Sequence, residues 1–208
     1  MKLYTFDIAP NPRRVALFMQ YKGITLDTQQ IDLGKLEQFS DSYKAINPDC
    51  SVPALALDSG DCLVDVVAIC SYLEGVYPDK PLLGADNLER AQVLGWMHRL
   101  YLSGFMAVAD MLRNQGDMFK DRALPGPDKV EQIPALVSRG RDRLAGFFRQ
   151  MNSICETRDY LVGDSLTQAD IDLLVVCEFA AWVKETVPES CAALLAHMAR
   201  VRAALPAS

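Results

Sequence analysis

The chain has 208 residues, half of them hydrophobic, and carries a formal net charge of -6 at pH 7. This length suffices for one large core or two smaller ones, so a folded globular protein is expected. The acidic balance, with a pI near 4.9 and no long run of lysine or arginine, argues against nucleic acid as a partner.

The first residues, MKLYTFDI, begin an alternating strand pattern instead of a basic segment followed by an apolar one, so no signal peptide is expected. No segment has the roughly 20 apolar residues that span a bilayer, so we expect no membrane anchor and a cytoplasmic location. The six cysteines form no C-x-x-C pair and only two histidines are present. This pattern predicts no metal site and reduced thiols.

Strand and helix signals alternate in the first part of the chain. Residues 2–6 predict a strand, and Asn11 followed by Pro12 is typical of a helix N-cap and first helical residue. The predicted helix ends near Gly23. A second strand, a short helix, two further strands and a helix that opens at Asp65 follow, giving the order β-α-β-α-β-β-α.

The periodicity breaks at YPDKPLLGADN, where two prolines and a glycine interrupt it. We therefore predict an α/β domain over 1–77, a linker over 78–86 and an all-helical domain over 87–208. Helices are expected over 88–112 and 130–151. A further helix opens at SLTQADI, where Thr167 and Asp170 have the spacing of a capping box.

Several motifs resemble the cytosolic glutathione S-transferase family. They are INPDCSVPALALDSGDCLVDVVAICSYLE, RRVALFMQYKGI and GDSLTQADI, which occur in the family's order across most of the chain. The resemblance implies a thioredoxin-like domain followed by an all-helical domain. The turn APNP looks like that of bacterial nu-class-like members, so an atypical active-site turn is expected.

The resemblance also implies a glutathione site. In the family the peptide bond before the proline of the Val-Pro pair is cis, so Val52 would be free to pair with the extended tripeptide through its backbone. Without the family, Pro53 would simply begin an edge strand. Gln38 and Ser51 are further candidates for contacts to glutathione.

Asp65 and Val66 occupy the positions expected to hold the γ-glutamyl end of glutathione. The Asp65 carboxylate would pair with the amine, and the backbone N–H of Val66 at the helix N-terminus would hold the carboxylate. The family usually has Glu/Asp-Ser here, and Val66 lacks the hydroxyl. The alternative role for Asp65 is an ordinary helix N-cap.

The first strand-helix turn lacks the serine, cysteine or tyrosine that normally faces the glutathione sulfur. Ala9 occupies the serine-like position, which leaves Asn11 as the catalytic candidate. Lowering a thiol pKa of about 8.5 by two units takes about 2.7 kcal/mol. An amide hydrogen bond to the thiolate could supply about 1.5–3 kcal/mol. The competing and favoured role for Asn11 is to cap the helix.

By resemblance, Tyr101 and Phe105 would line the pocket for a small hydrophobic electrophile or a disulfide, and the chain would form a homodimer. Two functions therefore follow from the sequence. One is a glutathione transferase or glutathione-dependent disulfide reductase, with glutathione as co-substrate. The other is a non-catalytic protein-interaction module that resembles the stringent starvation proteins at the level of the fold only.

Overall fold

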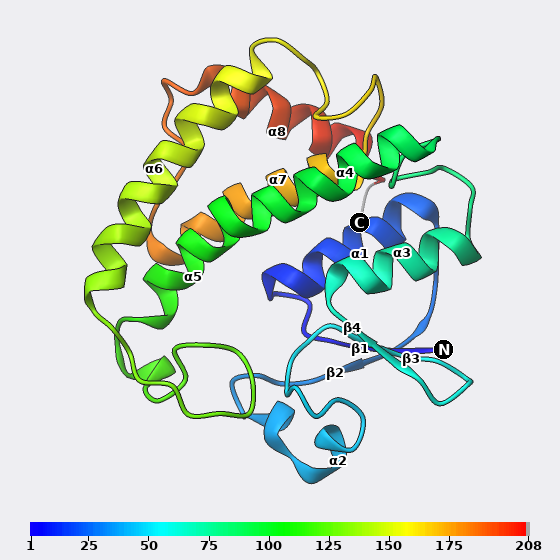
Figure 1. The fold of residues 1–208 in the computed structure, drawn as a ribbon, viewed down its shortest axis with the longest axis vertical. Coiled ribbons are helices and arrows are strands. Elements are labelled where there is room, and N and C mark those ends of the chain that lie inside the picture. Colours follow the sequence, from blue (N-terminus) through cyan, green and yellow to red (C-terminus); the bar gives the residue numbers. More distant parts are fainter. Residues whose placement is uncertain (207–208) are drawn as a thin grey trace. The chain divides into compact units, whose positions relative to one another are not determined.

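The computed structural model describes residues 1–206. It divides into two compact units (Figure 1). The first comprises residues 1–80 together with 124–128, and the second comprises 81–123 together with the chain from 129 onward. The sequence gives no sign that residues 124–128, which lie inside the predicted helical domain, belong to the first unit.

The first unit has the predicted β-α-β-α-β-β-α order. Its elements are β1 (Lys2–Thr5), α1 (Pro10–Lys22), β2 (Asp27–Gln30), a 3-10 turn (Glu37–Phe39), α2 (Asp41–Lys44), β3 (Ala54–Ala56), β4 (Cys62–Val64) and α3 (Val66–Val76). The strands form one sheet in the order β2-β1-β3-β4, in which only the β1–β2 pair is parallel. The thioredoxin-like arrangement expected from the sequence is confirmed.

The strand register brings three loops to one edge of this sheet. Ala54, at the start of β3, lies opposite Tyr4 near the end of β1 and opposite Val64 at the end of β4. The turn after β1, the segment before β3 and the turn after β4 therefore meet at the same edge. These three loops contain most of the residues for which the sequence predicts a ligand-binding role.

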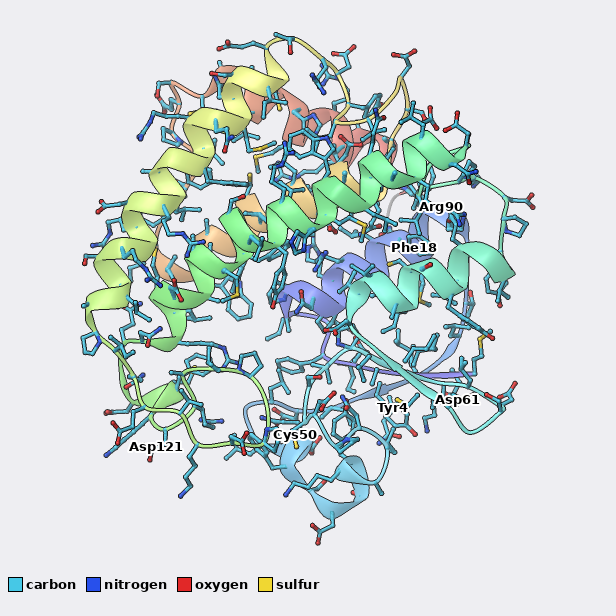
Figure 2. All side chains as sticks on the ribbon, viewed as in Figure 1. Tyr4, Phe18, Cys50, Asp61, Arg90 and Asp121 are labelled. Carbon is cyan, nitrogen blue, oxygen red and sulfur yellow. The ribbon has the colours of Figure 1, made fainter. Side chains whose placement is uncertain are left out.

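The two faces of the sheet are buried by different helices. Figure 1 shows α1 and α3 on one side of the sheet and α2 on the other. Tyr4 is labelled at the sheet in Figure 2. Its ring meets that of Tyr43 in α2 edge-on, with 5.9 Å between the centroids, so it lies on the α2 side. Its neighbour Leu3 is also buried, as the two-residue period of a strand requires when both faces are covered.

Helix α1 begins two residues earlier than predicted. It starts at Pro10 with Ala9 as the N-cap, and no side chain caps it, so the prediction that Asn11 is the N-cap is wrong. In the run Ala-Pro-Asn-Pro either proline could be the first helical residue, and the prediction chose Pro12 instead of Pro10. Pro10 and Pro12 have no N–H, which removes two of the donors that a cap would otherwise satisfy. The predicted end at Gly23 is confirmed, with φ +71°.

The second unit is helical, as predicted. Its elements are α4 (Asn87–Leu100), a π-helical turn (Tyr101–Phe105), α5 (Met106–Arg113), α6 (Ala135–Cys155), α7 (Gln168–Phe179) and α8 (Ala192–Ala204), with 3-10 turns at Asp117–Phe119 and Ala180–Val183. The capping box at α7 is confirmed, since Asp170 accepts hydrogen bonds from both the backbone N–H and the hydroxyl of Thr167. None of the helices within residues 1–206 is both long and apolar enough to cross a membrane.

A buried ion pair joins the C-terminal turn of α1 to α3. The ammonium group of Lys22 lies 2.7 Å from Oε2 of Glu74, and the two side chains are 0% and 6% exposed. The same ammonium donates to the carbonyl oxygens of Asp79 and Lys80, so all three of its N–H groups have acceptors. The Lys22 ammonium therefore joins α1 both to α3 and to residues 79–80 at the end of the first unit.

We expect Lys22→Met to lower the free energy of unfolding by about 3 kcal/mol, because it leaves the Glu74 carboxylate buried without this cation. Urea unfolding followed by circular dichroism measures the change. Lys35→Met is the matched control, since the Lys35–Asp32 pair is exposed and should contribute little. An equal effect of the two substitutions would contradict the assignment.

Candidate functional site

Asn11 lies in the first turn of α1 with its side-chain amide held in one orientation. Its Oδ1 accepts a hydrogen bond of 3.0 Å from Nη1 of Arg14. Because a guanidinium only donates, the oxygen of the amide must face Arg14 and the NH2 group must point elsewhere. Within residues 1–206 this NH2 group has no acceptor, nor has the backbone N–H of Asn11. The residue thus presents two free donor groups, the amide NH2 and the backbone N–H, at the start of a helix.

Arg14 is a functional candidate that the sequence analysis did not identify. It is only 3% exposed, although it belongs to a residue type that is rarely buried. Its spacing of three residues from Asn11, on the face of the helix that also carries buried Val15 and Phe18, is the signal that could have revealed it. A buried guanidinium beside the amide favours a negative charge nearby.

The segment before β3 presents free backbone groups at the same edge. The Val52–Pro53 peptide bond is cis, as the resemblance implies. Neither the N–H nor the C=O of Val52 forms a backbone hydrogen bond within the described part of the chain. An extended peptide could therefore pair with Val52 as one added strand residue.

Ser51, just before Val52, is held firmly by two side chains from the α2 region. Its carbonyl oxygen accepts hydrogen bonds from the Tyr43 hydroxyl at 2.5 Å and from Nδ2 of Asn47 at 2.8 Å. Burial raises the pKa of Tyr43 to about 12, so the hydroxyl remains a donor at neutral pH. Tyr43 and Asn47 are 2% and 0% exposed, so this support is rigid.

Asp65 stands before α3 with an unusual backbone and a side chain that caps nothing. Its φ is +69° and its ψ is 144°, a region that residues other than glycine rarely adopt. Although it occupies the N-cap position, its carboxylate makes no capping hydrogen bond, so the ordinary N-cap role considered for Asp65 is wrong. The carboxylate is exposed to solvent and available to a ligand.

Val66, the first residue of α3, offers only its backbone to a ligand. Its side chain is 3% exposed and belongs to the core. The backbone N–H groups of Val66 and Val67 have no acceptor among residues 1–206, as expected for the first turn of a helix. Together with the helix dipole they form a site suited to a carboxylate.

A pocket opens beside these residues. It is lined by Asp49, Ser51, Val64, Asp65 and the tripeptide Pro125–Pro127. All of them belong to the first unit. The tripeptide was not among the predicted site residues. The run LPGPD, with a glycine between two prolines, indicates a loop there but not which unit the loop contacts.

The remaining predicted residues lie in less open surroundings. Gln38 is 7% exposed, and its Oε1 is buried without a hydrogen-bond partner. Phe105 is 4% exposed and packs against Tyr101 and Phe179, so its ring contributes to the helical core. Tyr101 is 38% exposed and keeps a surface that a substrate could contact.

Within residues 1–206 no three His, Cys, Asp or Glu side chains are grouped to hold a metal ion.

Comparison with known proteins identifies relatives along both units. The sequence model of the family described as Glutathione S-transferase, N-terminal domain matches residues 8–76, and that of Glutathione S-transferase, C-terminal domain matches residues 128–205. Glutathione S-transferase 2 of Saccharomyces cerevisiae is 28% identical, with 97% of this chain and 85% of the yeast protein covered. Maleylacetoacetate isomerase of Pseudomonas aeruginosa is 30% identical, with 68% and 82% covered.

A solved structure supports the same relationship. The crystal structure of a glutathione S-transferase domain-containing protein from Marinobacter aquaeolei superposes with a TM-score of 0.88. The two sequences are 31% identical, and the alignment covers 98% of each chain. The similarity thus extends over both units.

We expect Tyr43→Phe to lower the free energy of unfolding by about 1 kcal/mol below pH 10, because it removes the donor to Ser51. The folded pKa of Tyr43 lies above the unfolded value, so this contribution is complete below pH 10 and is lost as the pH rises toward 12. Urea unfolding of both proteins at several pH values measures the difference. A difference that stayed constant from pH 8 to 12 would contradict the role of the hydroxyl.

Proposed function

Because this chain belongs to the glutathione S-transferase family, we propose that it binds glutathione at the sheet edge and activates the glutathione thiol with Asn11. The observation that carries this proposal is the Arg14–Asn11 hydrogen bond, which leaves the amide NH2 group free. The thiolate then reacts with an electrophile or a disulfide.

Glutathione is placed by groups from all three loops at the edge. The cysteinyl residue pairs with the free N–H and C=O of Val52, next to Pro53. The γ-glutamyl ammonium pairs with Asp65, and the γ-glutamyl carboxylate meets the N–H groups at the start of α3. Ser51 and Gln38 are the further proposed contacts, of which Ser51 lines the pocket.

The NH2 group of Asn11 takes the place of the hydroxyl or thiol that is usual in the family. A hydrogen bond to a charged sulfur contributes about 1.5–3 kcal/mol, and the N-terminus of α1 adds about 0.3–1 kcal/mol. A two-unit decrease of the thiol pKa takes about 2.7 kcal/mol. Together the two interactions contribute about 1.8–4 kcal/mol, a range that includes the stabilisation required to ionise most of the bound thiol at neutral pH.

In the reaction the thiolate sulfur donates its electron pair to the second substrate. With an electrophile, a carbon–sulfur bond forms and the leaving group departs with the electron pair of its bond. With a disulfide, a new sulfur–sulfur bond forms and the other sulfur leaves as a thiolate. The thiol proton is released to solvent when glutathione binds. Within residues 1–206 none of the six cysteines forms a disulfide, which fits work in a reducing compartment such as the cytoplasm.

A second part of the proposal concerns a homodimer. The exposed face of α3 carries no charged residue, although the protein is acidic. Its members are Val67, Ala68, Ser71, Tyr72, Gly75 and Val76. Small and apolar side chains on one helical face are suited to a self-complementary interface. We assign this face to the dimer contact.

We expect Asn11→Ala to raise the pKa of the glutathione thiol in the complex by about 1–2 units, because the thiolate loses its amide donor. Absorbance of the thiolate at 240 nm as a function of pH measures this pKa. Turnover with an electrophilic aryl halide should fall in proportion to the lost thiolate.

Asn11→Asp separates this role from a structural one. The aspartate retains an acceptor for Arg14 but has no N–H to donate, and its charge opposes the thiolate. The fold and the thermal stability should be preserved while the pKa of the bound thiol rises at least as far as in Asn11→Ala. A bound thiol with the wild-type pKa in both variants would overturn the catalytic role of Asn11.

For the dimer we expect Tyr72→Asp to weaken self-association on the order of 100-fold, because the charges of both subunits would enter the interface. Sedimentation equilibrium measures the dissociation constant. Leu36→Asp, an exposed apolar position outside the α3 face, is the matched control and should leave it unchanged. A wild-type protein that is monomeric at all concentrations, or a Tyr72→Asp variant as dimeric as wild type, would refute the interface.

A further inference from the structure

The connection between α5 and α6 contains a strap that belongs to the first unit. Residues 124–128, with the sequence Leu-Pro-Gly-Pro-Asp, are part of that unit, while the chain on both sides belongs to the second. The tip of the strap, Pro125–Pro127, lines the same pocket as Ser51 and Asp65. The strap is therefore a wall of the pocket at which we place the γ-glutamyl end of glutathione.

The strap is built upon an ordered base. The backbone N–H of Ala123 donates to the carbonyl of Val130 at 3.0 Å, and the N–H of Val130 donates to the carbonyl of Asp121 at 3.0 Å. The guanidinium of Arg113 donates to the carbonyl of Arg122 at 2.7 Å. These bonds close the loop at its base.

The side chains of the pocket favour a cationic group. Asp49 and Asp65 contribute carboxylates, and no cationic side chain lines the pocket. An ammonium group is thus well matched, but the carboxylate next to it needs N–H donors. In the family a hydroxyl at the position of Val66 usually helps, and here that side chain is apolar and buried.

The strap contributes one backbone donor to the lining of this pocket. Of the three residues at its tip, only Gly126 has an N–H, because proline has none. This N–H has no acceptor within residues 1–206. We propose that the N–H of Gly126 donates to the α-carboxylate of the γ-glutamyl group, replacing the hydroxyl that Val66 lacks, and so determines specificity for γ-glutamyl thiols. This inference rests on the proposed binding of glutathione.

The local sequence fits this role. Gly126 has φ +120°, which side chains other than hydrogen rarely allow. A Cβ atom built on Gly126 would meet nothing within 4 Å, so the backbone conformation, and not crowding, requires glycine. The flanking prolines restrict the loop before the ligand arrives, which reduces the entropy lost on binding.

The test compares two ligands in calorimetric titrations. One is glutathione, and the other is 4-aminobutyryl-cysteinylglycine, which differs only in lacking the α-carboxylate. We expect Gly126→Ala, which disturbs the backbone at the N–H, to weaken glutathione binding about tenfold. Binding of the decarboxylated analogue should be equal in the variant and the wild type.

Two further variants guard against a general loss of structure. Gly116→Ala places the same side chain at a positive-φ glycine in the same connection, with open space around it and no part in the pocket. It should leave both affinities unchanged. The double variant Pro125→Ala/Pro127→Ala keeps the glycine N–H and should weaken glutathione binding only a few-fold.

The outcomes separate this inference from the proposed function. Wild-type protein that binds neither ligand at millimolar concentration would refute the proposed function. Wild-type protein that binds glutathione, with Gly126→Ala binding it equally well, would refute the role of the strap alone. An equal loss for both ligands in Gly126→Ala would also refute it, because the contact would not be to the carboxylate.

Discussion

The site depends on the register of three short strands, β1, β3 and β4. With Tyr4, Ala54 and Val64 opposite one another, the turn that carries Asn11, the segment that carries Val52 and the turn that carries Asp65 all end at one edge. A shift of one residue in any pairing would send every side chain of that strand to the other face. Between β1 and β3 such a shift is disfavoured, because Leu3, Tyr4, Ala54 and Leu55 are all buried and would exchange side chains of different size between the α1–α3 side and the α2 side (Figure 1).

In the proposed function, backbone and amide N–H groups make contacts to glutathione that hydroxyl groups usually make in the family. In the first turn, a buried arginine turns the Asn11 amide so that its NH2 group is free. At α3, the strained backbone of Asp65 leaves its carboxylate free of helix capping. In our account Gly126 supplies the donor that Val66 does not. The two replacements, at Asn11 and at Gly126, are N–H groups, the kind of donor that suits a thiolate or a carboxylate.

The sequence predicts the fold well because its signals are local. Gly23 ends α1 by its left-handed conformation, and the Thr167–Asp170 spacing caps α7. The prediction for Asn11 was wrong because two prolines compete for the first helical position, and only the positions of the strand and helix in space decide between them. The Arg14 contact was not predicted, because hydrophobic periodicity does not show that a single arginine is buried. The strap was not predicted, because packing between residues far apart in the sequence is not visible in a local sequence pattern.

The central claim is that this edge of the sheet binds a γ-glutamyl thiol peptide. The most direct measurement is a titration of the uniformly ¹⁵N-labelled wild-type protein with reduced glutathione, followed by amide chemical shifts. The account predicts saturable shifts concentrated at Val52, at Asp65 to Val67 and at Gly126. Shifts that do not saturate at millimolar glutathione, or that saturate elsewhere, for example in the helical unit, would contradict it.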